Sequence, residues 1–340
     1  STYDAMSDIT AEPALSKVEA RWTLAITILA SSVAFIDMTI VNLALPVMQR
    51  EFASDFHDVQ WVVEAYVLLL TAVTLTGGGL ADAYGRRKIL WIGAAIFLVA
   101  SVMAGISTST PMLIAARALQ GFGGALLAPA SLAIVSSSFA PSERGRALGL
   151  WAAFSGVSTA IAPSIGGVLI ELWSWRAVFL VNVPILAAVL ILTPFRLRES
   201  VRSRSGSQRP AVDYWGGLAA IATLAPLTFA LLRVGETGFA DLLVILCFLG
   251  ASVMGIVFVL IERSVPAPML PLGLFESRAF SGLNLMTLVL FVAVGAVMFF
   301  LPMTLMNALH YSPMQAGLAM IPSMGVMFCI APQAGKFADR

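Results

Sequence analysis

Long apolar runs dominate the pattern of hydrophobic and polar positions along the 340-residue chain. Ten of these runs are long enough to cross a membrane as helices, which takes about 20 mostly apolar residues. They lack the alternation of short β-barrel strands, so they predict an all-α polytopic membrane protein. The predicted spans cover residues 22–46, 60–80, 89–106, 112–135, 147–170, 177–194, 215–232, 240–261, 280–306 and 314–334.

The composition supports a membrane protein and excludes several other classes. Hydrophobic residues make up 59% of the chain and charged residues 11%, whereas soluble domains carry about 25% charged residues. A net charge of +1 argues against a nucleic-acid-binding surface. The two cysteines, Cys247 and Cys329, lie inside apolar runs, with no spacing typical of metal ligands. Neither a metal nor a cofactor is expected, and the lack of hydrolase and nucleotide-binding motifs argues against an enzyme.

The distribution of Lys and Arg between the spans predicts the orientation of the chain, because cytoplasmic loops are enriched in both residues. Of these 20 residues, 16 lie in segments on the side of the N-terminus and three lie on the opposite side. The remaining one, Arg117, falls inside the fourth span. Both termini are therefore predicted to be cytoplasmic, with ten crossings between them.

The polar segments divide the chain into five predicted regions. Residues 1–21 are expected to form a disordered cytoplasmic tail, and residues 22–195 a six-helix bundle. Residues 196–213 form a basic, Ser-rich linker, which is either a solvated loop or a segment that binds anionic lipid headgroups. Residues 214–262 add two further helices. Residues 263–340 supply the first two helices of a second, incomplete bundle.

One polar turn, GGLADAYGRRK at residues 78–88, is long and specific enough to count as a motif. Gly78 and Gly85 suit a close backbone approach and positive φ. Asp82 lies at the C-terminal end of the predicted second span, where the helix dipole disfavours an anion. It therefore needs a cationic partner, and Arg86 is the nearest candidate. The pattern partly recurs as GKFADR at residues 335–340, and internal repeats of this kind are typical of secondary transporters.

With this motif, the chain resembles the major facilitator superfamily from about residue 22 to residue 340. Four further segments carry the resemblance. The first resembles the first-helix motif of the 14-helix drug:proton antiporters of the EmrB/QacA type, the second is similar to the fourth-helix motif of the superfamily, the third resembles the end of the helix-five antiporter motif, and the fourth is typical of this family. These segments are FIDMTIVNLALP (35–46), LIAARALQGFGGA (113–125), APSIGG (162–167) and WSWRAVFLVNVP (173–184).

The resemblance implies fourteen helices, of which about ten are expected here, because the chain stops inside the second loop motif. It implies a multi-pass protein of the bacterial inner membrane that exports amphipathic or cationic toxic compounds in exchange for protons by alternating access. Two alternatives remain open: a non-transporting, C-terminally truncated fragment of such a transporter, or a carrier of another small solute. Small molecules, protons and the lipid bilayer are the expected partners, and the oligomeric state is left open.

Three ionisable residues lie inside predicted spans, where a charge costs roughly 2.5–3.5 kcal/mol and therefore marks a functional candidate. Asp37 could exchange a proton for a cationic substrate, or could be tied to a neighbouring helix by hydrogen bonds. The resemblance gives Arg117 a role in proton coupling or in holding a helix, with a structural ion pair or carbonyl clamp as the alternative. Glu64 is either a second protonation or drug site or an interfacial carboxylate wetted by headgroups.

The resemblance also assigns two conformational elements. The loop motif, with Gly78, Asp82, Gly85, Arg86 and Arg87, is expected to act in the conformational switch. The helix-five antiporter motif, with Pro163, Gly166 and Gly167, is expected to lie between the two halves of the transporter and limit leakage, although ordinary use of Gly and Pro in membrane helices is the alternative.

Overall fold

The computed structural model describes residues 15–199 and 213–309, apart from 267 and 269, and a few single positions up to 322. Ten α-helices and one 3₁₀ helix make up this part of the chain. They are α1 (Lys17–Phe52), α2 (Phe56–Tyr84), α3 (Arg86–Gly105), α4 (Thr110–Ser138), α5 (Pro141–Leu172), α6 (Ala177–Leu180), α7 (Asn182–Arg196), α8 (Tyr214–Thr237), α9 (Leu242–Ser264), η2 (Leu272–Glu276) and α10 (Arg278–Asn307).

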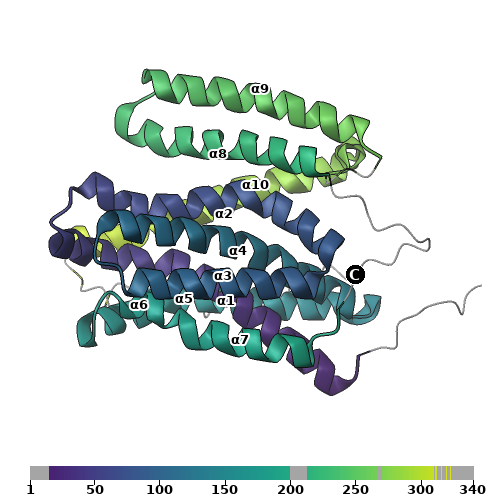
Figure 1. Ribbon diagram of the computed structural model, residues 1–340, viewed down its shortest axis with the longest axis horizontal. Helices are drawn as coiled ribbons and strands as arrows, with labels where there is room; N and C mark the ends of the chain where they lie inside the picture. Colours follow the sequence, from purple (N-terminus) through teal and green to yellow (C-terminus); the bar gives the residue numbers. More distant parts are fainter. Residues whose placement is uncertain are drawn as a thin grey trace, which may run out of the picture.

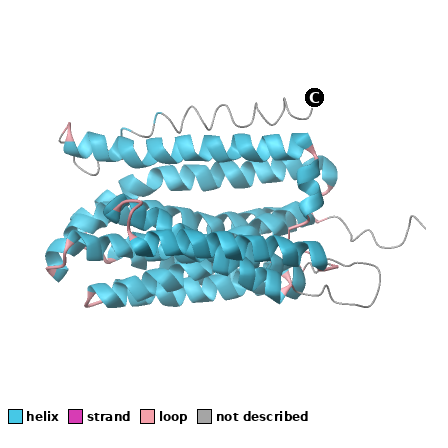
Figure 2. Ribbon diagram, turned by 90° about the horizontal axis from the view of Figure 1, so that it is seen from above, coloured by secondary structure: helices cyan, strands magenta, loops and turns pink. Residues whose placement is uncertain are grey.

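In the described part, nine helical segments are long and apolar enough to cross a membrane, with α6 and α7 together forming one of them. They coincide, within a few residues, with the first nine spans that the hydrophobic pattern predicts. The tenth predicted span, 314–334, lies outside the described residues. Figure 2 shows the helices side by side along one axis, with the turns gathered at the two ends.

The start of the first helix differs from the prediction, because α1 begins at Lys17 within the expected disordered tail. Ser16 and Glu19 form a capping box, in which each side chain accepts a hydrogen bond from the other residue's backbone N–H. This arrangement satisfies two backbone donors at the helix end. Polar composition alone therefore gave the wrong boundary, although the S-x-x-E pattern was present.

Helices α1 to α7 form one bundle (Figure 1). Within it α4 packs against α1, α2 and α3, while α1 also packs against α5 and α7. Two clusters of buried apolar side chains fill the interior, one around Phe97 and Leu127 and the other around Ile40 and Trp175. Between these clusters lie the buried polar residues that define the candidate site.

The hairpin of α8 and α9 lies along one side of the bundle (Figure 1) and meets it through α2. Trp61 on α2 stacks near Phe229 on α8, with ring centroids 5.7 Å apart, and Thr76 donates a hydrogen bond to the carbonyl of Gly217. Large apolar side chains of α9 and α10, such as Leu246 and Leu288, are exposed. Such surfaces are unfavourable in water and suit a lipid environment.

Candidate functional site

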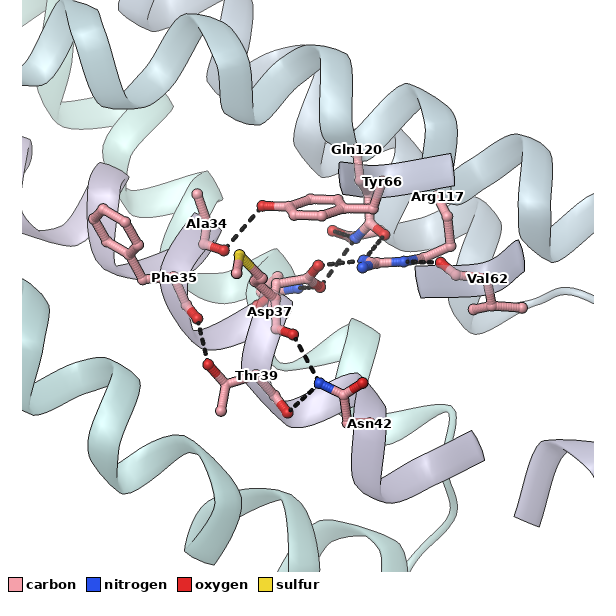
Figure 3. A network of polar contacts seen from close by, with 12 residues as sticks. Ala34, Phe35, Asp37, Thr39, Asn42, Val62, Tyr66, Arg117 and Gln120 are labelled. Carbon is pink, nitrogen blue, oxygen red and sulfur yellow. Dashed lines mark hydrogen bonds and ion pairs between the residues drawn. The ribbon is translucent and has the colours of Figure 1, made fainter. Parts of the chain in front are cut away.

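An ion pair in the middle of the bundle joins Asp37 on α1 to Arg117 on α4 (Figure 3). The Nη1 atom of Arg117 donates to Oδ2 of Asp37, and both side chains are fully buried. The sequence marked each residue separately and did not predict that the two would touch. Their contact neutralises two charges that would each be costly in a membrane interior.

Arg117 is also held by groups other than Asp37. Its Nε atom donates to the carbonyl of Val62 at 2.9 Å, and its Nη1 atom also contacts Oε1 of Gln120 at 2.8 Å. The guanidinium carbon lies 4.2 Å from the centroid of the Tyr66 ring, within the range of a cation–π interaction. Within the described residues, Nη2 of Arg117 has no hydrogen-bond partner. Arg117 thus keeps several contacts on α2 and α4 that do not depend on Asp37.

Two buried amides complete the surroundings of the Asp37 carboxyl group. Oδ1 of Asp37 accepts hydrogen bonds from Nδ2 of Asn182 at 2.9 Å and from Nε2 of Gln120 at 3.3 Å. Gln120 donates as well to the hydroxyl of Ser101 on α3, at 2.9 Å. We call Asp37, Arg117, Gln120 and Asn182 the carboxyl network. The sequence analysis assigned no role to Gln120 or Asn182, although each is a polar residue inside an apolar run.

This arrangement can hold a carboxylate or a neutral acid in the same place. The ionised form is stabilised by three donors from two helices, and one of these donors is positively charged. A proton on Asp37 would cancel the ion pair and leave Arg117 on the Val62 carbonyl, the Gln120 amide and the Tyr66 ring. One buried carboxyl group therefore has the chemistry to bind and release a single proton with a change in its contacts.

Glu64, the third predicted ionisable residue, lies apart from this network. Val62 and Tyr66, one turn apart on α2, both contact Arg117, whereas Glu64 is two residues from each and projects from a different face of the helix. Its side chain is 5% exposed and accepts a hydrogen bond from Nε2 of Gln60 at 2.7 Å. The alternative of a carboxylate wetted by headgroups is therefore wrong, because this side chain is buried.

The loop motif forms the turn between α2 and α3. Arg86 contacts Oδ1 of Asp82 at 2.7 Å through Nη2, as the sequence predicts, and donates from Nη1 to the carbonyl of Ala133 on α4 at 3.0 Å. Gly85 has a φ of 103°, so the predicted positive φ is confirmed. The close approach, however, occurs at Gly77 instead of Gly78: a Cβ on Gly77 would lie less than 3.0 Å from the carbonyl oxygen of Ala125.

Arg87, beside this pair, joins the turn to the segment that follows α7. Its Nε atom lies 3.3 Å from Oε2 of Glu199, and its backbone N–H donates to Oε1 of the same carboxylate. The guanidinium also donates to the carbonyl of Leu197 at 3.1 Å. A carboxylate in the first turn of a helix complements the helix dipole, so Glu199 stabilises the start of α3. The sequence analysis did not identify Glu199.

The helix-five residues Pro163, Gly166 and Gly167 are buried in α5. A Cβ on Gly166 would overlap the side chain of Ile40 on α1, so Gly166 permits close packing of α5 against α1 within the six-helix bundle. This contact lies inside the first half of the chain. The predicted location of the motif between the two halves remains a prediction.

At the end of the bundle remote from the loop motif, Arg176 and Trp175 both bind Glu51, the penultimate residue of α1. Nη1 of Arg176 lies 2.6 Å from Oε1, and Nε1 of Trp175 donates to Oε2 at 2.5 Å. Trp175 is 1% exposed, so its side chain belongs to the interior of the bundle. A cavity of about 400 Å³ opens beside Glu51 and is lined by Asp58 and Thr110.

The described part of the chain has no group of three or more His, Cys, Asp or Glu side chains placed to bind a metal ion.

Curated proteins similar to this chain include several resistance and export proteins. The multidrug resistance protein Stp of Mycobacterium tuberculosis strain CDC 1551 is 33% identical over 94% of the chain and 59% of its own length. The methylenomycin A resistance protein of Bacillus subtilis is 34% identical over 86% of the chain and 62% of its own length. The tetracenomycin C resistance and export protein of Streptomyces glaucescens is 33% identical over the whole chain and 63% of its own length. The chain thus spans about three fifths of the length of these relatives.

The fold is similar to that of solved transporter structures. A crystal structure of the peptide transporter POT in complex with sulfate matches with a TM-score of 0.58 over 97% of this chain and 72% of that chain, at 15% identity. At that identity the match concerns the fold alone. Residues 27–340 also match the Major Facilitator Superfamily. The motifs, the helical bundle and these matches agree, and the chain belongs to the major facilitator superfamily of membrane transporters.

Proposed function

We propose that the chain acts in a secondary transporter that exports amphipathic or cationic toxic compounds from a bacterial cell in exchange for protons. The observation that carries this proposal is the fully buried Asp37–Arg117 ion pair, which places a carboxyl group, a possible proton carrier, inside the bundle. In this scheme a proton from outside binds Asp37 and promotes substrate release. Loss of the proton to the cytoplasm restores the ion pair and the next substrate binds.

Two further observations support export of drugs. Several relatives are named for multidrug resistance or efflux, among them Stp and the multidrug efflux pump LfrA of Mycolicibacterium smegmatis, which is 32% identical over 96% of the chain. The chain also lacks a nucleotide-binding motif, so export would have to use an ion gradient. Each charge moved through 100 mV supplies about 2.3 kcal/mol.

The test is proton-driven dye efflux, measured as uptake of a cationic dye into inverted membrane vesicles, whose lumen corresponds to the outside of the cell and is made acidic, with Asp37→Asn as the diagnostic variant. The wild type should move dye in proportion to the gradient, and Asp37→Asn should abolish this dependence. Asp55→Asn is the matched control, because Asp55 is exposed and its side chain makes no cap hydrogen bond at the start of α2. Gradient-driven efflux by Asp37→Asn at the wild-type rate would contradict the proposal.

A second candidate substrate class is a single antibiotic made by the host. It is favoured by relatives named for resistance to one compound each, such as methylenomycin A and, in Streptomyces alboniger, puromycin. An accumulation assay over several dyes and several antibiotics separates the two classes. A broad dye profile supports multidrug export, whereas protection against one antibiotic without dye efflux supports the second class.

The proposal includes the orientation and helix number implied by the antiporter resemblance. Both termini would be cytoplasmic, and the two helices α8 and α9 would separate two six-helix halves of a 14-helix transporter. Single cysteines at Lys88 and at Ser109 in a cysteine-free background test the orientation, since these residues lie at opposite ends of the bundle. A membrane-impermeant thiol reagent added to intact cells should label position 109 and leave position 88 unlabelled. The reverse pattern would overturn the orientation.

A further inference from the structure

Asn182 differs from the other two donors to Asp37 in having no second side-chain partner. Arg117 is also bound by Val62 and Gln120, and Gln120 is also bound by Ser101. Among the described residues, the one hydrogen bond of the Asn182 side chain goes to Oδ1 of Asp37. Asn182 is 1% exposed, so water offers little replacement for that bond.

The chemistry of an amide suits a carboxyl group that changes its protonation state. An ionised carboxylate can accept hydrogen bonds and donate none, whereas a protonated carboxyl group also carries one O–H donor. Asn182 can offer its N–H to the first form and, after half a turn of the amide, its carbonyl oxygen to the second. Gln120 cannot turn in this way without losing the contact between its Oε1 atom and Arg117.

Few ionisable groups face Asp37, so a change in its protonation state alters a small number of contacts. The ionisable residues that hydrogen-bond or stack within this network are Arg117 from α4 and Tyr66 from α2. Besides α4, the helices packed against α1 in the described part are α2, α5, α6 and α7. Glu64 in α2 projects from a different face of its helix, and Glu143 and Glu171 in α5 and Arg196 in α7 lie toward the helix ends.

Asn182 lies near the start of the sixth span, where the helix runs on from α6 to α7 through Val181, whose N–H donates to the carbonyl of Ala177 at 3.0 Å. Asn182 is the first residue of α7, and α6 ends two residues earlier at Leu180. Just before α6, Trp175 and Arg176 bind Glu51 near the end of α1. The sixth span and the residues just before it therefore make polar contacts with α1 at two levels, with Asp37 in the middle of α1 and with Glu51 near its end.

We infer that Asn182 is a positioning residue that senses the protonation state of Asp37 and changes the contact of the sixth span with α1 accordingly. When Asp37 is ionised, the Asn182 N–H holds the start of α7 against α1. When Asp37 is protonated, the amide turns or releases, and the polar contacts with Glu51 and the apolar packing of α6 and α7 against α1 remain. This role in transport rests on the proposed function, whereas the sensing of protonation can be measured without transport.

The experiment follows the protonation of Asp37 directly by infrared difference spectroscopy of the purified protein over a pH series. The carboxylic acid band that Asp37→Asn removes reports the protonated side chain. In Asn182→Leu, which keeps the size and removes the donor, this band should appear at a higher pH, by about one pH unit, the size expected for one lost hydrogen bond to a charged group. In Asn182→Asp, which places a second carboxyl group beside the first, the shift should be larger.

The matched control is Asn284→Leu on α10, where an exposed amide donates to the carbonyl of Phe280; the band should keep its wild-type midpoint. If the band of both Asn182 variants titrates at the wild-type pH, Asn182 is a packing residue and the inference is overturned. Dye efflux measured on the same samples separates the two proposals. If the band is shifted in the Asn182 variants but the wild type shows no proton-driven efflux, the inference about Asn182 is supported and the proposed transport function is overturned.

Discussion

Gly121 on α4 lies directly against the backbone of Tyr66 on α2. A Cβ at position 121 would lie less than 3.0 Å from the carbonyl oxygen of Tyr66, and that oxygen belongs to a helix and cannot turn away. One turn earlier on α4, Arg117 meets Val62 and the Tyr66 ring. The close approach at Gly121 therefore sets the distance at which α2 supports the buried guanidinium.

Gly121→Ala should destabilise the protein, because the added methyl group forces α2 and α4 apart. Overpacking of this kind typically costs about 1–3 kcal/mol. The measurement is the thermal midpoint in detergent, with Gly149→Ala as control, since a Cβ at position 149 meets nothing within 4 Å. Gly149→Ala should leave the midpoint unchanged or slightly higher. Equal midpoints for the two variants would contradict the packing argument.

Asp82 and Arg86 should be coupled in stability, by about 0.2–1 kcal/mol, because the Asp82 side chain is 44% exposed and solvent screens the pair. A double-mutant cycle with Asp82→Asn and Arg86→Gln measures this coupling. Arg86→Gln alone should be the more harmful change, since it also removes the hydrogen bond to the Ala133 carbonyl. Strictly additive losses would mean that the pair contributes no interaction energy.

The turn between α8 and α9 should lose stability in acid. The Thr237 hydroxyl, the Leu243 N–H and the Arg233 guanidinium hold the pKa of Asp241 below its usual range. An acidic group whose pKa is lowered by folding stabilises the fold at any pH above its pKa in the unfolded chain, which is about 3.9 for Asp. This contribution is lost as the pH falls through the lower pKa of the folded state. Asp241→Asn should therefore be less stable than wild type near pH 6, and the difference should shrink toward pH 3. A constant difference across this range would exclude ionisation as its cause.

Glu64→Gln tests a buried carboxyl group outside the carboxyl network. Because Gln60 donates to Glu64, the amide variant can keep the hydrogen bond by turning, and its folding should be close to wild type. If Glu64 binds protons or cationic drugs, the variant should change the drug profile and the pH dependence of efflux. Unchanged profiles would remove Glu64 from the mechanism, with Gln60→Ala as the control for the hydrogen bond itself.

The spans were predictable because about 20 apolar residues in a row have few other stable forms than a membrane helix. The Asp82–Arg86 pair was also predictable, since it spans four residues and one turn. The contact between Asp37 and Asn182 was not, because the two residues are 145 positions apart and depend on the packing of α1 against α7. The same reason applies to Trp175: its place near the end of a span was visible in the sequence, but its contact with Glu51, 124 positions away, was not.

The sequence separation within the buried ion pair sets a delay between the synthesis of its two partners. Asp37 belongs to the first helix, and Arg117 comes 80 residues later. At a synthesis rate of about 5–20 residues per second, Asp37 precedes its partner by roughly 4–16 s. An unpaired carboxylate is costly in hydrocarbon, so the first helix has to wait either as a neutral acid or beside the insertion machinery. The protein thus depends on α4 during its biogenesis, long before any substrate is present.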